Sequence, residues 1–269
     1  MTITFTHTKG GKNKMAFDLN SISKGKALRA PRILLLGVEK IGKSTFASQS
    51  DDAIFLPIKG EEGADDLDVA KFPTAQKYGD VLEALSTLYT QDHDYKTVVI
   101  DSASTLEPLI WDSVSKRSGV ESIEKVDGGF GKGYVEALRE WRQITDGLDA
   151  LRSEKNMASI LIGHVTVKAF NDPTADSYDT FLFDIHKRAS EALQRWVDVI
   201  LFCNRRVAVR KEETGFNKTK ARATGGGDPF LYTQKRPAHP GGGRGVYGRL
   251  PYELPLNWQS FADAVASAH

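Results

Sequence analysis

A nine-residue segment, Gly37 to Thr45, constrains the fold of this chain more than any other stretch of its sequence. It reads Gly-Val-Glu-Lys-Ile-Gly-Lys-Ser-Thr and fits the pattern G-x-x-x-x-G-K-[ST] at every fixed position. The apolar run Ile33–Leu36 precedes it, and a helix is expected from Lys43 to Ser50. Between a strand and a helix, such glycines let the backbone fold around an anion while N–H groups point at phosphate oxygens. The segment therefore predicts a nucleoside triphosphate site.

The side chains of this segment have expected roles. Lys43 would reach the β- and γ-phosphates, and Ser44 would hold Mg²⁺. A plain glycine-containing turn is the alternative, but the flanking strand and helix favour the phosphate site. The expected ligands are ATP and Mg²⁺, and the residues expected to form the phosphate site are Gly37, Val38, Glu39, Lys40, Ile41, Gly42, Lys43, Ser44 and Thr45.

The composition is that of an ordinary globular protein. The chain has 269 residues, 40% of them hydrophobic and 26% charged, which suits one large α/β domain. No apolar run approaches the ~18 residues of a membrane span, and the N-terminus lacks the features of a signal peptide. The single cysteine, Cys203, excludes an internal disulfide and fits a reducing cytoplasm. Its apolar neighbours predict a buried strand residue and argue against a nucleophile.

Strands and helices are expected to alternate along the chain. This order predicts an α/β fold with a twisted, mainly parallel sheet, helices on both faces and antiparallel strands at the C-terminal edge. The closely spaced strands after Val197 leave no room for crossover helices, so we expect them to extend one edge of the sheet. The expected strands are 33–36, 53–57, 97–100, 158–163, 197–202, 206–210 and 230–234, and the expected helices are 43–50, 75–89, 105–116, 134–152, 187–195 and one from Gln259.

The ends of the chain differ from the middle in charge. Residues 1–32 carry seven Lys and Arg and one acid, and residues 204–249 carry eleven Lys and Arg and three acids. This distribution indicates either a one-sided contact with a polyanion or ordinary solvated charge. We expect a flexible basic arm over 1–30 and one ATPase domain over 31–269, which includes a glycine-rich basic loop region at 225–249 and a C-terminal cap at 250–269.

Three further positions are candidates for chemistry at the phosphate site. Asp101 ends an apolar strand and is expected to hold Mg²⁺, although it could instead cap the next helix. Glu61 or Glu62, after the strand 53–57, is expected to activate water, with a solvated acidic loop as the alternative. His164 follows the strand 158–163 and is expected to sense the γ-phosphate, with a structural role as the alternative.

Two segments combine basic and aromatic residues in the way that suits single-stranded nucleic acid. The expected loop 165–185 contains Lys168, Phe170 and Tyr178, and the glycine-rich stretch 124–134 contains Lys132. Bases stack on aromatic rings while phosphates pair with Lys and Arg. A packed connection and a simple exposed loop are the alternatives.

Taken together, these residues resemble the RecA-like ATPases. The chain most closely resembles the small phage ATP-binding proteins of the Sak-type single-strand annealing group, which share the RecA/RadA core. Many families share the phosphate loop, so the resemblance depends on Glu61-Glu62-Gly63, Ile100-Asp101-Ser102 and Gly163-His164 in combination. The matching stretches span most of residues 31–258 and are Gly37–Thr45, Ala53–Asp68, Thr97–Trp111, Gly131–Tyr134, Ser159–Phe170 and Leu250–Trp258.

The resemblance implies that ATP binding or hydrolysis is coupled to single-stranded DNA. It implies subunits that stack into a filament or ring with ATP near their interface, and a single-strand-binding protein as a further partner. His164 would replace the glutamine of RecA proteins, and the loop after it would correspond to their DNA-binding loop. Relatives often carry a Lys-Asn-Arg-Tyr-like stretch before Leu-Pro. At 243–251 this chain instead has the sequence Gly-Arg-Gly-Val-Tyr-Gly-Arg-Leu-Pro. The basic residue that acts on a neighbour's phosphate is therefore left open among Lys235, Arg236, Arg244 and Arg249.

The leading prediction is a Mg²⁺-dependent ATPase that binds single-stranded DNA and promotes annealing or strand pairing in phage recombination. An ATP-dependent assembly scaffold with negligible hydrolysis is the alternative. A small-molecule phosphoryl transferase is less favoured because the chain shows no arginine-rich lid. We expect a cytoplasmic protein, in the bacterial host if it is phage-encoded, without a membrane partner.

Overall fold

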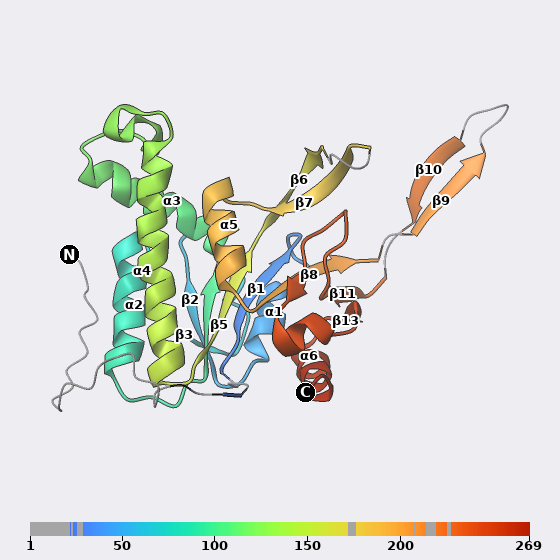
Figure 1. Cartoon of the computed structure of the whole chain (residues 1–269), viewed down its shortest axis with the longest axis horizontal. Helices are drawn as coiled ribbons and strands as arrows, with labels where there is room; N and C mark the ends of the chain where they lie inside the picture. The colour runs from blue at the N-terminus through green and yellow to red at the C-terminus, as the bar shows by residue number, and fades with distance from the viewer. Residues whose placement is uncertain are drawn as a thin grey trace.

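A computed structural model describes residues 22, 24–25, 29–171, 176–206, 208–213, 219–224 and 227–269. Most of the expected arm at 1–30 therefore lies outside the described residues. A mixed sheet occupies the centre of the molecule, in the strand order β13-β11-β8-β1-β5-β4-β2-β3, with β12 also paired to β8 (Figure 1). The nine strands are β1 Arg32–Gly37, β2 Ala53–Pro57, β3 Ala70–Lys71, β4 Thr97–Asp101, β5 Ala158–Gly163, β8 Val199–Arg205, β11 Pro229–Tyr232, β12 Gly242–Gly243 and β13 Glu253–Pro255.

Six strands, from β3 to β8 in sheet order, run parallel, and β11 and β13 continue the sheet in antiparallel pairs. This arrangement confirms the α/β fold with a mainly parallel sheet. The helices and 3-10 segments that accompany it are α1 Lys43–Ser48, α2 Tyr78–Thr90, α3 Ala103–Arg117, η2 Ile123–Gly128, α4 Lys132–Glu154, α5 Lys187–Trp196, η3 Gly245–Arg249 and α6 Trp258–Ser267.

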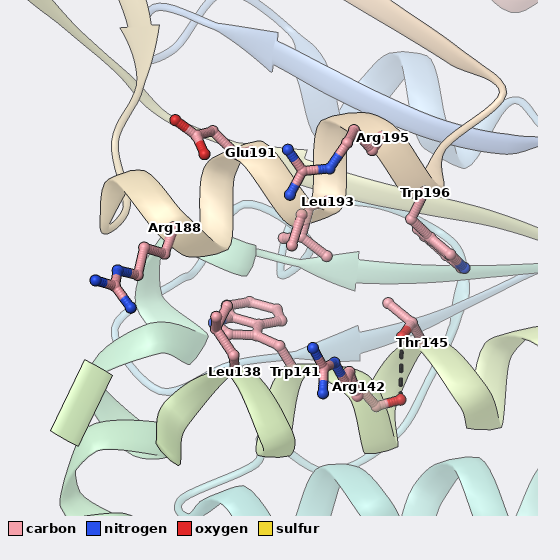
Figure 2. A pocket seen from close by; sticks show the side chains of 10 residues that line it. Leu138, Trp141, Arg142, Thr145, Arg188, Glu191, Leu193, Arg195 and Trp196 are labelled. Carbon is pink, nitrogen blue, oxygen red and sulfur yellow. Dashed lines mark hydrogen bonds between the residues drawn. The ribbon is translucent and has the colours of Figure 1, made fainter. Parts of the chain in front are cut away.

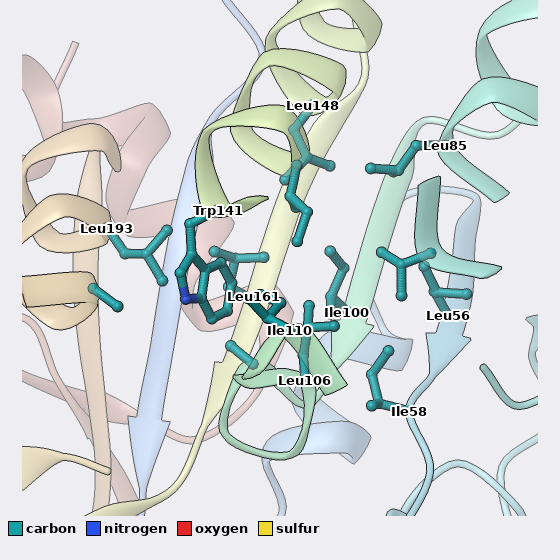
Figure 3. Packing of buried hydrophobic residues seen from close by; sticks show 14 of the residues in the cluster. Leu56, Ile58, Leu85, Ile100, Leu106, Ile110, Trp141, Leu148, Leu161 and Leu193 are labelled. Atoms are coloured by element: carbon teal, nitrogen blue, oxygen red, sulfur yellow. The ribbon is translucent and has the colours of Figure 1, made fainter. Parts of the chain in front are cut away.

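Successive side chains of a strand point to opposite faces of the sheet, so the strands contribute to two separate hydrophobic cores. In β1, Leu34 and Leu36 belong to a cluster with Trp141 and Leu148 of α4, whereas Ile33 and Leu35 belong to a second cluster on the opposite face. Figure 3 shows the first cluster, where residues of α2, α3, α4 and α5 pack against β2, β4 and β5. Helices α1 and α6 cover the other face. Both faces of the parallel sheet are therefore buried, which explains why its strands are continuous apolar runs.

The apolar residues of α4 recur at helical spacing and lie on the face that packs against the core. In α4, Trp141, Ile144, Leu148 and Leu151 are buried, and Leu138 packs against the cluster from its edge. Cys203 is also buried, in β8, and burial raises the pKa of its thiol to about 12. The prediction of a structural cysteine is therefore confirmed.

The expectation for the strands after Val197 is partly wrong. Strand β8 pairs parallel with β1 in the middle of the sheet, because α5 precedes it and provides the crossover from β5. The strand expected at 206–210 corresponds to β9 (Ala208–Glu213), which pairs with β10 (Thr219–Thr224) in a separate two-stranded sheet. The antiparallel extension of the edge is made by β11 and β13.

The expected loop at 165–185 is instead a β-hairpin. Strand β6 (Val165–Phe170) starts directly after His164 and pairs antiparallel with β7 (Tyr178–Phe183). Figure 1 shows this hairpin extending from the end of β5. Val165, Thr166 and Val167 favour a strand, and a structureless connection of this length would be unusual in a compact domain.

Candidate active site

The segment Gly37–Thr45 forms a tight loop from the end of β1 to the start of α1. Gly42 is the residue before the helix and has φ +107°, and Lys40 has φ +55°. A side chain other than glycine is strained at the first of these angles, which explains the second glycine of the pattern. The loop and the N-terminus of α1 therefore face the carboxyl edge of the parallel strands, where ligands bind in such sheets.

Lys43 occupies the centre of this loop. Its side chain is 6% exposed, and Nζ donates to the carbonyl oxygens of Gly37 at 2.9 Å and Val38 at 2.8 Å. Burial lowers the pKa of Lys43, while the charges of Cys203, Asp101, Glu61 and Glu39 oppose that shift. Among the described residues no carboxylate forms an ion pair with Nζ. A phosphate group would supply the counter-charge that this buried ammonium lacks.

Ser44 and Asp101 come together at the neighbouring position. Ser44 Oγ donates to Oδ2 of Asp101 across 2.8 Å, and Asp101 is 2% exposed. Burial raises the pKa of Asp101; the hydrogen bond from Ser44 opposes the rise, and the charge of Glu61 adds to it. Mg²⁺ is bound by hard oxygen ligands from the protein together with substrate phosphates. The Ser44 hydroxyl and the Asp101 carboxylate, whose charged form is destabilised by burial, are ligands of this kind. These residues therefore fit a magnesium ion bound with a nucleotide.

Gly63 closes this position from the other side. A Cβ atom at Gly63 would lie 2.7 Å from Ser44 Oγ and 3.3 Å from Asp101 Oδ2. The first distance is shorter than side-chain contacts allow. Only glycine lets the segment after β2 approach the Ser44–Asp101 pair this closely.

Glu61 is held by two donors. Oε1 accepts from Ser102 Oγ at 2.7 Å and lies 2.7 Å from His164 Nε2. Because Oε1 is a carboxylate oxygen, Nε2 must carry the proton and donate. Burial alone would raise the pKa of Glu61, but the hydrogen bonds from His164 and Ser102 outweigh it and hold the pKa below its usual value. Glu61 is therefore an ionised, oriented carboxylate.

Ser102 has a second role at the start of α3. It is the N-cap residue, and its Oγ accepts from the backbone N–H of Thr105 at 3.3 Å. Ser102, and not Asp101, therefore caps the helix, which leaves the Asp101 carboxylate to Ser44. Ser104, in the first turn of α3, accepts from the backbone N–H of His164 at 3.0 Å. Sequence reasoning assigned no role to Ser102, although a serine directly before a helix is a recognisable N-cap signal.

One cavity of about 750 Å³ is lined by Lys43, Ser44, Glu61, Asp101 and His164. Its lining residues come from the loop, from the segment after β2, and from the ends of β4 and β5. Glu62 also lines the cavity, but it is exposed and its side chain forms no hydrogen bond with a described residue. The two glutamates thus differ, since Glu61 is fixed among the reacting groups and Glu62 stands at the rim.

The proposed nucleic-acid contacts lie elsewhere. Lys168 and Phe170 are exposed on β6, and the ring of Phe170 lies 5.5 Å from that of Tyr178 on β7. Lys132, at the start of α4, forms an ion pair with Asp127 at 3.0 Å. Phe130 next to it is fully exposed.

The four basic candidates for contact with a neighbour differ in their surroundings. Arg244 donates to the carbonyl oxygens of Arg195, Trp196 and Val197 at the end of α5. Nη2 of Arg244 is thus engaged inside its own subunit. The Arg236 guanidinium lies 4.4 Å from the centre of the Tyr252 ring, and Lys235 and Arg249 are exposed.

The fold and this site define a protein of the P-loop NTPase class. A family model described as an AAA domain matches residues 29–245, and the chain belongs to that family. No curated protein matches the sequence. Among solved structures, the crystal structure of the RadB recombinase is similar, with 16% identity, a TM-score of 0.37, and coverage of 65% of this chain and 76% of that one. No helix in the described residues is both long and apolar enough to cross a membrane.

Proposed function

We propose that this protein is a Mg²⁺-dependent ATPase that binds single-stranded DNA and promotes annealing or strand pairing in phage recombination. The observation that carries the proposal is the position of Glu61, which is ionised, hydrogen-bonded by Ser102 and His164, and in the same cavity as Lys43. Phosphoryl transfer to water needs mainly positioning and charge stabilisation, and this cavity offers both.

Each side chain has a defined role in the proposed reaction. Lys43 and the loop N–H groups bind the β- and γ-phosphates. Ser44 and Asp101 would hold Mg²⁺, and the bound ion would supply positive charge to the phosphates. Within the described residues Glu61 Oε2 has no hydrogen-bond partner, so it is free to orient the attacking water and accept its proton. His164 keeps Oε1 fixed and lies close enough to the cavity to respond to the γ-phosphate.

Coupling to DNA would proceed through the hairpin β6–β7, because His164 is followed directly by β6. Val167, Phe170 and Leu182 are large apolar side chains that are 54%, 43% and 41% exposed on this hairpin. Together with Lys168 they offer an apolar and basic surface to unpaired bases. Phe130 and Lys132 offer a second one. We infer that DNA on the hairpin changes the position of His164 and thereby the contact with Glu61.

The oligomer belongs to the same proposal. Lys235 and Arg236 follow β11 and are exposed, so they are better placed to reach a neighbour's phosphate than Arg244, whose guanidinium is held against the end of α5 by Nη2. A filament or ring would then place ATP between subunits, and a single-strand-binding protein would be a further partner.

The test measures ATP hydrolysis with and without single-stranded DNA. The wild-type protein should hydrolyse ATP slowly alone and faster with DNA, and Lys43→Ala should abolish both rates. Negative-stain images should show filaments or rings only with ATP and DNA present. Equal hydrolysis with and without DNA would sink the proposed coupling.

A scaffold that uses ATP only for assembly is the second candidate. Glu61 Oε1 is fully engaged by protein donors, an arrangement that would also suit a resting carboxylate. Annealing that survives Glu61→Gln but is lost in Lys43→Ala would favour the scaffold.

A further inference from the structure

A groove between α4 and α5 has no role in the site described above. It has a volume of about 350 Å³, and three arginines border it: Arg142 from α4, and Arg188 and Arg195 from α5 (Figure 2). Its inner surface includes Leu138, Leu193 and the buried ring of Trp141. We call it the arginine groove.

The charges of the arginine groove are unbalanced. Arg142, Arg188 and Arg195 are exposed, and none of them forms an ion pair with a described residue. The only acidic side chain among the lining residues is Glu191, which lies 4.0 Å from Lys187. By contrast, Arg139 of α4, outside the groove, pairs with Glu136 at 3.0 Å. A ligand that carries both negative charge and apolar surface would complement three unpaired arginines that surround apolar residues.

The aromatic rings of the groove do not offer a platform for bases. Trp141 is 2% exposed. Trp196 is held by a hydrogen bond from Nε1 to Asp149 Oδ2 at 3.0 Å, and the Arg32 guanidinium covers its ring at 5.1 Å. Stacking of unpaired bases needs an open ring face. The volume of about 350 Å³ suits a few side chains and is small for a continuous nucleic-acid strand. A peptide therefore fits the groove better than a nucleic acid.

We propose that the arginine groove binds an acidic peptide segment of a partner protein, in which an apolar side chain stands between carboxylates. Arg188 and Arg195 are seven residues apart, which corresponds to about 10.5 Å along a helix. Carboxylates four positions apart in an extended peptide lie on the same face about 13 Å apart, with the side chain midway between them on that face too, and the flexible arginine side chains cover the difference in length. The apolar side chain between them enters the groove over the partly exposed Leu138, and Arg142 pairs with a carboxylate from the opposite wall. This proposal stands apart from the proposed ATPase function, because none of its residues lines the phosphate cavity.

The test uses the full chain and a fluorescein-labelled peptide in which phenylalanines stand between pairs of aspartates, with binding followed by fluorescence anisotropy. Two control peptides carry asparagine in place of aspartate, or alanine in place of phenylalanine. Wild-type protein should bind the first peptide and neither control. The double variant Arg142→Ala/Arg195→Ala should bind it about tenfold more weakly, since two exposed ion pairs are lost.

The matched control is Arg139→Ala, which removes an exposed arginine of α4 outside the groove and should bind the peptide as the wild type does. Thermal unfolding and basal ATP hydrolysis should be unchanged in all of these variants. Failure of the wild-type protein to bind the peptide at about 100 μM overturns the proposal, and so does equal affinity in the double variant. A fluorescein-labelled oligothymidylate that binds wild-type protein and competes with the peptide, but is not bound by the double variant, would assign the groove to nucleic acid and also overturn it.

Discussion

Nε2 of His164 donates to Oε1 of Glu61 across 2.7 Å, and this contact joins the residue after β5 to the segment after β2. Ser102, at the end of β4, donates to the same oxygen. The ends of three neighbouring strands thus converge on one carboxylate oxygen, and the second oxygen, Oε2, accepts no hydrogen bond from a described residue. An ionised Glu61 is consistent with this, because both donors stabilise the charged form and lower its pKa.

Glu61→Gln should lower kcat for ATP hydrolysis by about 10²- to 10⁴-fold, the usual contribution of a positioned general base. ATP binding should be retained, because Lys43 and the loop are untouched. The measurement is steady-state hydrolysis together with binding of a fluorescent ATP analogue. Glu62→Gln is the matched control, and it should leave kcat within about twofold because Glu62 is exposed at the rim. Similar losses in both variants would count against Glu61 as the base.

Ser102→Ala should lower kcat by about tenfold, since one hydrogen bond to a charged acceptor is lost. Because that bond helps to lower the pKa of Glu61, its loss should also move the acidic limb of the pH profile to higher pH. The variant loses a helix cap as well, at a cost of about 1 kcal/mol in stability.

Asn257→Ala separates these two effects. Asn257 caps α6 by accepting from Ser260 N–H at 2.8 Å and does not line the phosphate cavity. Loss of this cap should cost a similar free energy of unfolding, seen as a lower unfolding temperature. It should leave kcat and the pH profile unchanged. If the pH profile of Ser102→Ala does not move, Ser102 acts only as the N-cap of α3.

Much of the framework could be predicted from the sequence. The bounds of β2 and β5 match the expected strands, because each is a short apolar run with a clear polar boundary. The glycines and Lys43 of the phosphate loop follow a fixed spacing. Parallel strands end at a common edge, so residues such as Asp101 and His164, at the ends of separate strands, were expected to lie near one site.

The remaining features depend on contacts between distant parts of the chain. Glu61 and Ser102 are 41 positions apart, and no local pattern marks their hydrogen bond. The role of Gly63 appears only when the segment after β2 is packed against Ser44. The sequence analysis predicts a loop where the hairpin β6–β7 lies, although its aromatic and β-branched residues favour strands.

Gly63→Ala should weaken the response to Mg²⁺. The added methyl would lie 2.7 Å from Ser44 Oγ, so the Ser44–Asp101 pair would have to move. We expect the Mg²⁺ concentration for half-maximal hydrolysis to rise on the order of tenfold, in line with the cost of overpacking a tight site. Gly79→Ala in α2, where a Cβ meets no atom within 4 Å, is the control and should be tolerated. An unchanged Mg²⁺ titration for Gly63→Ala would show that the ion is held elsewhere.

Glu107 makes stability depend on pH. This carboxyl group is 3% exposed in α3; Oε2 accepts from the His186 N–H at 2.7 Å, and the nearby Trp141 side chain interacts with the carboxyl group without forming a hydrogen bond of ordinary geometry. Burial raises the pKa of Glu107 to about 7, so the folded protein holds a proton that the unfolded chain releases near its ordinary value. The stabilising contribution is complete below that ordinary value. It falls as pH rises toward about 7, and above this value it is lost.

Glu107→Gln should therefore remove this part of the pH dependence. The neutral amide keeps an acceptor for His186 N–H and cannot ionise, so at pH ~8 the variant should be more stable than wild type by about 3 kcal/mol at most. At pH ~5 the two proteins should differ little. Thermal unfolding across this pH range is the measurement. Glu136→Gln, at a more exposed position on α4, is the control and should follow the wild-type curve. Parallel curves for wild type and Glu107→Gln would mean that Glu107 is ionised in the folded protein at all of these pH values.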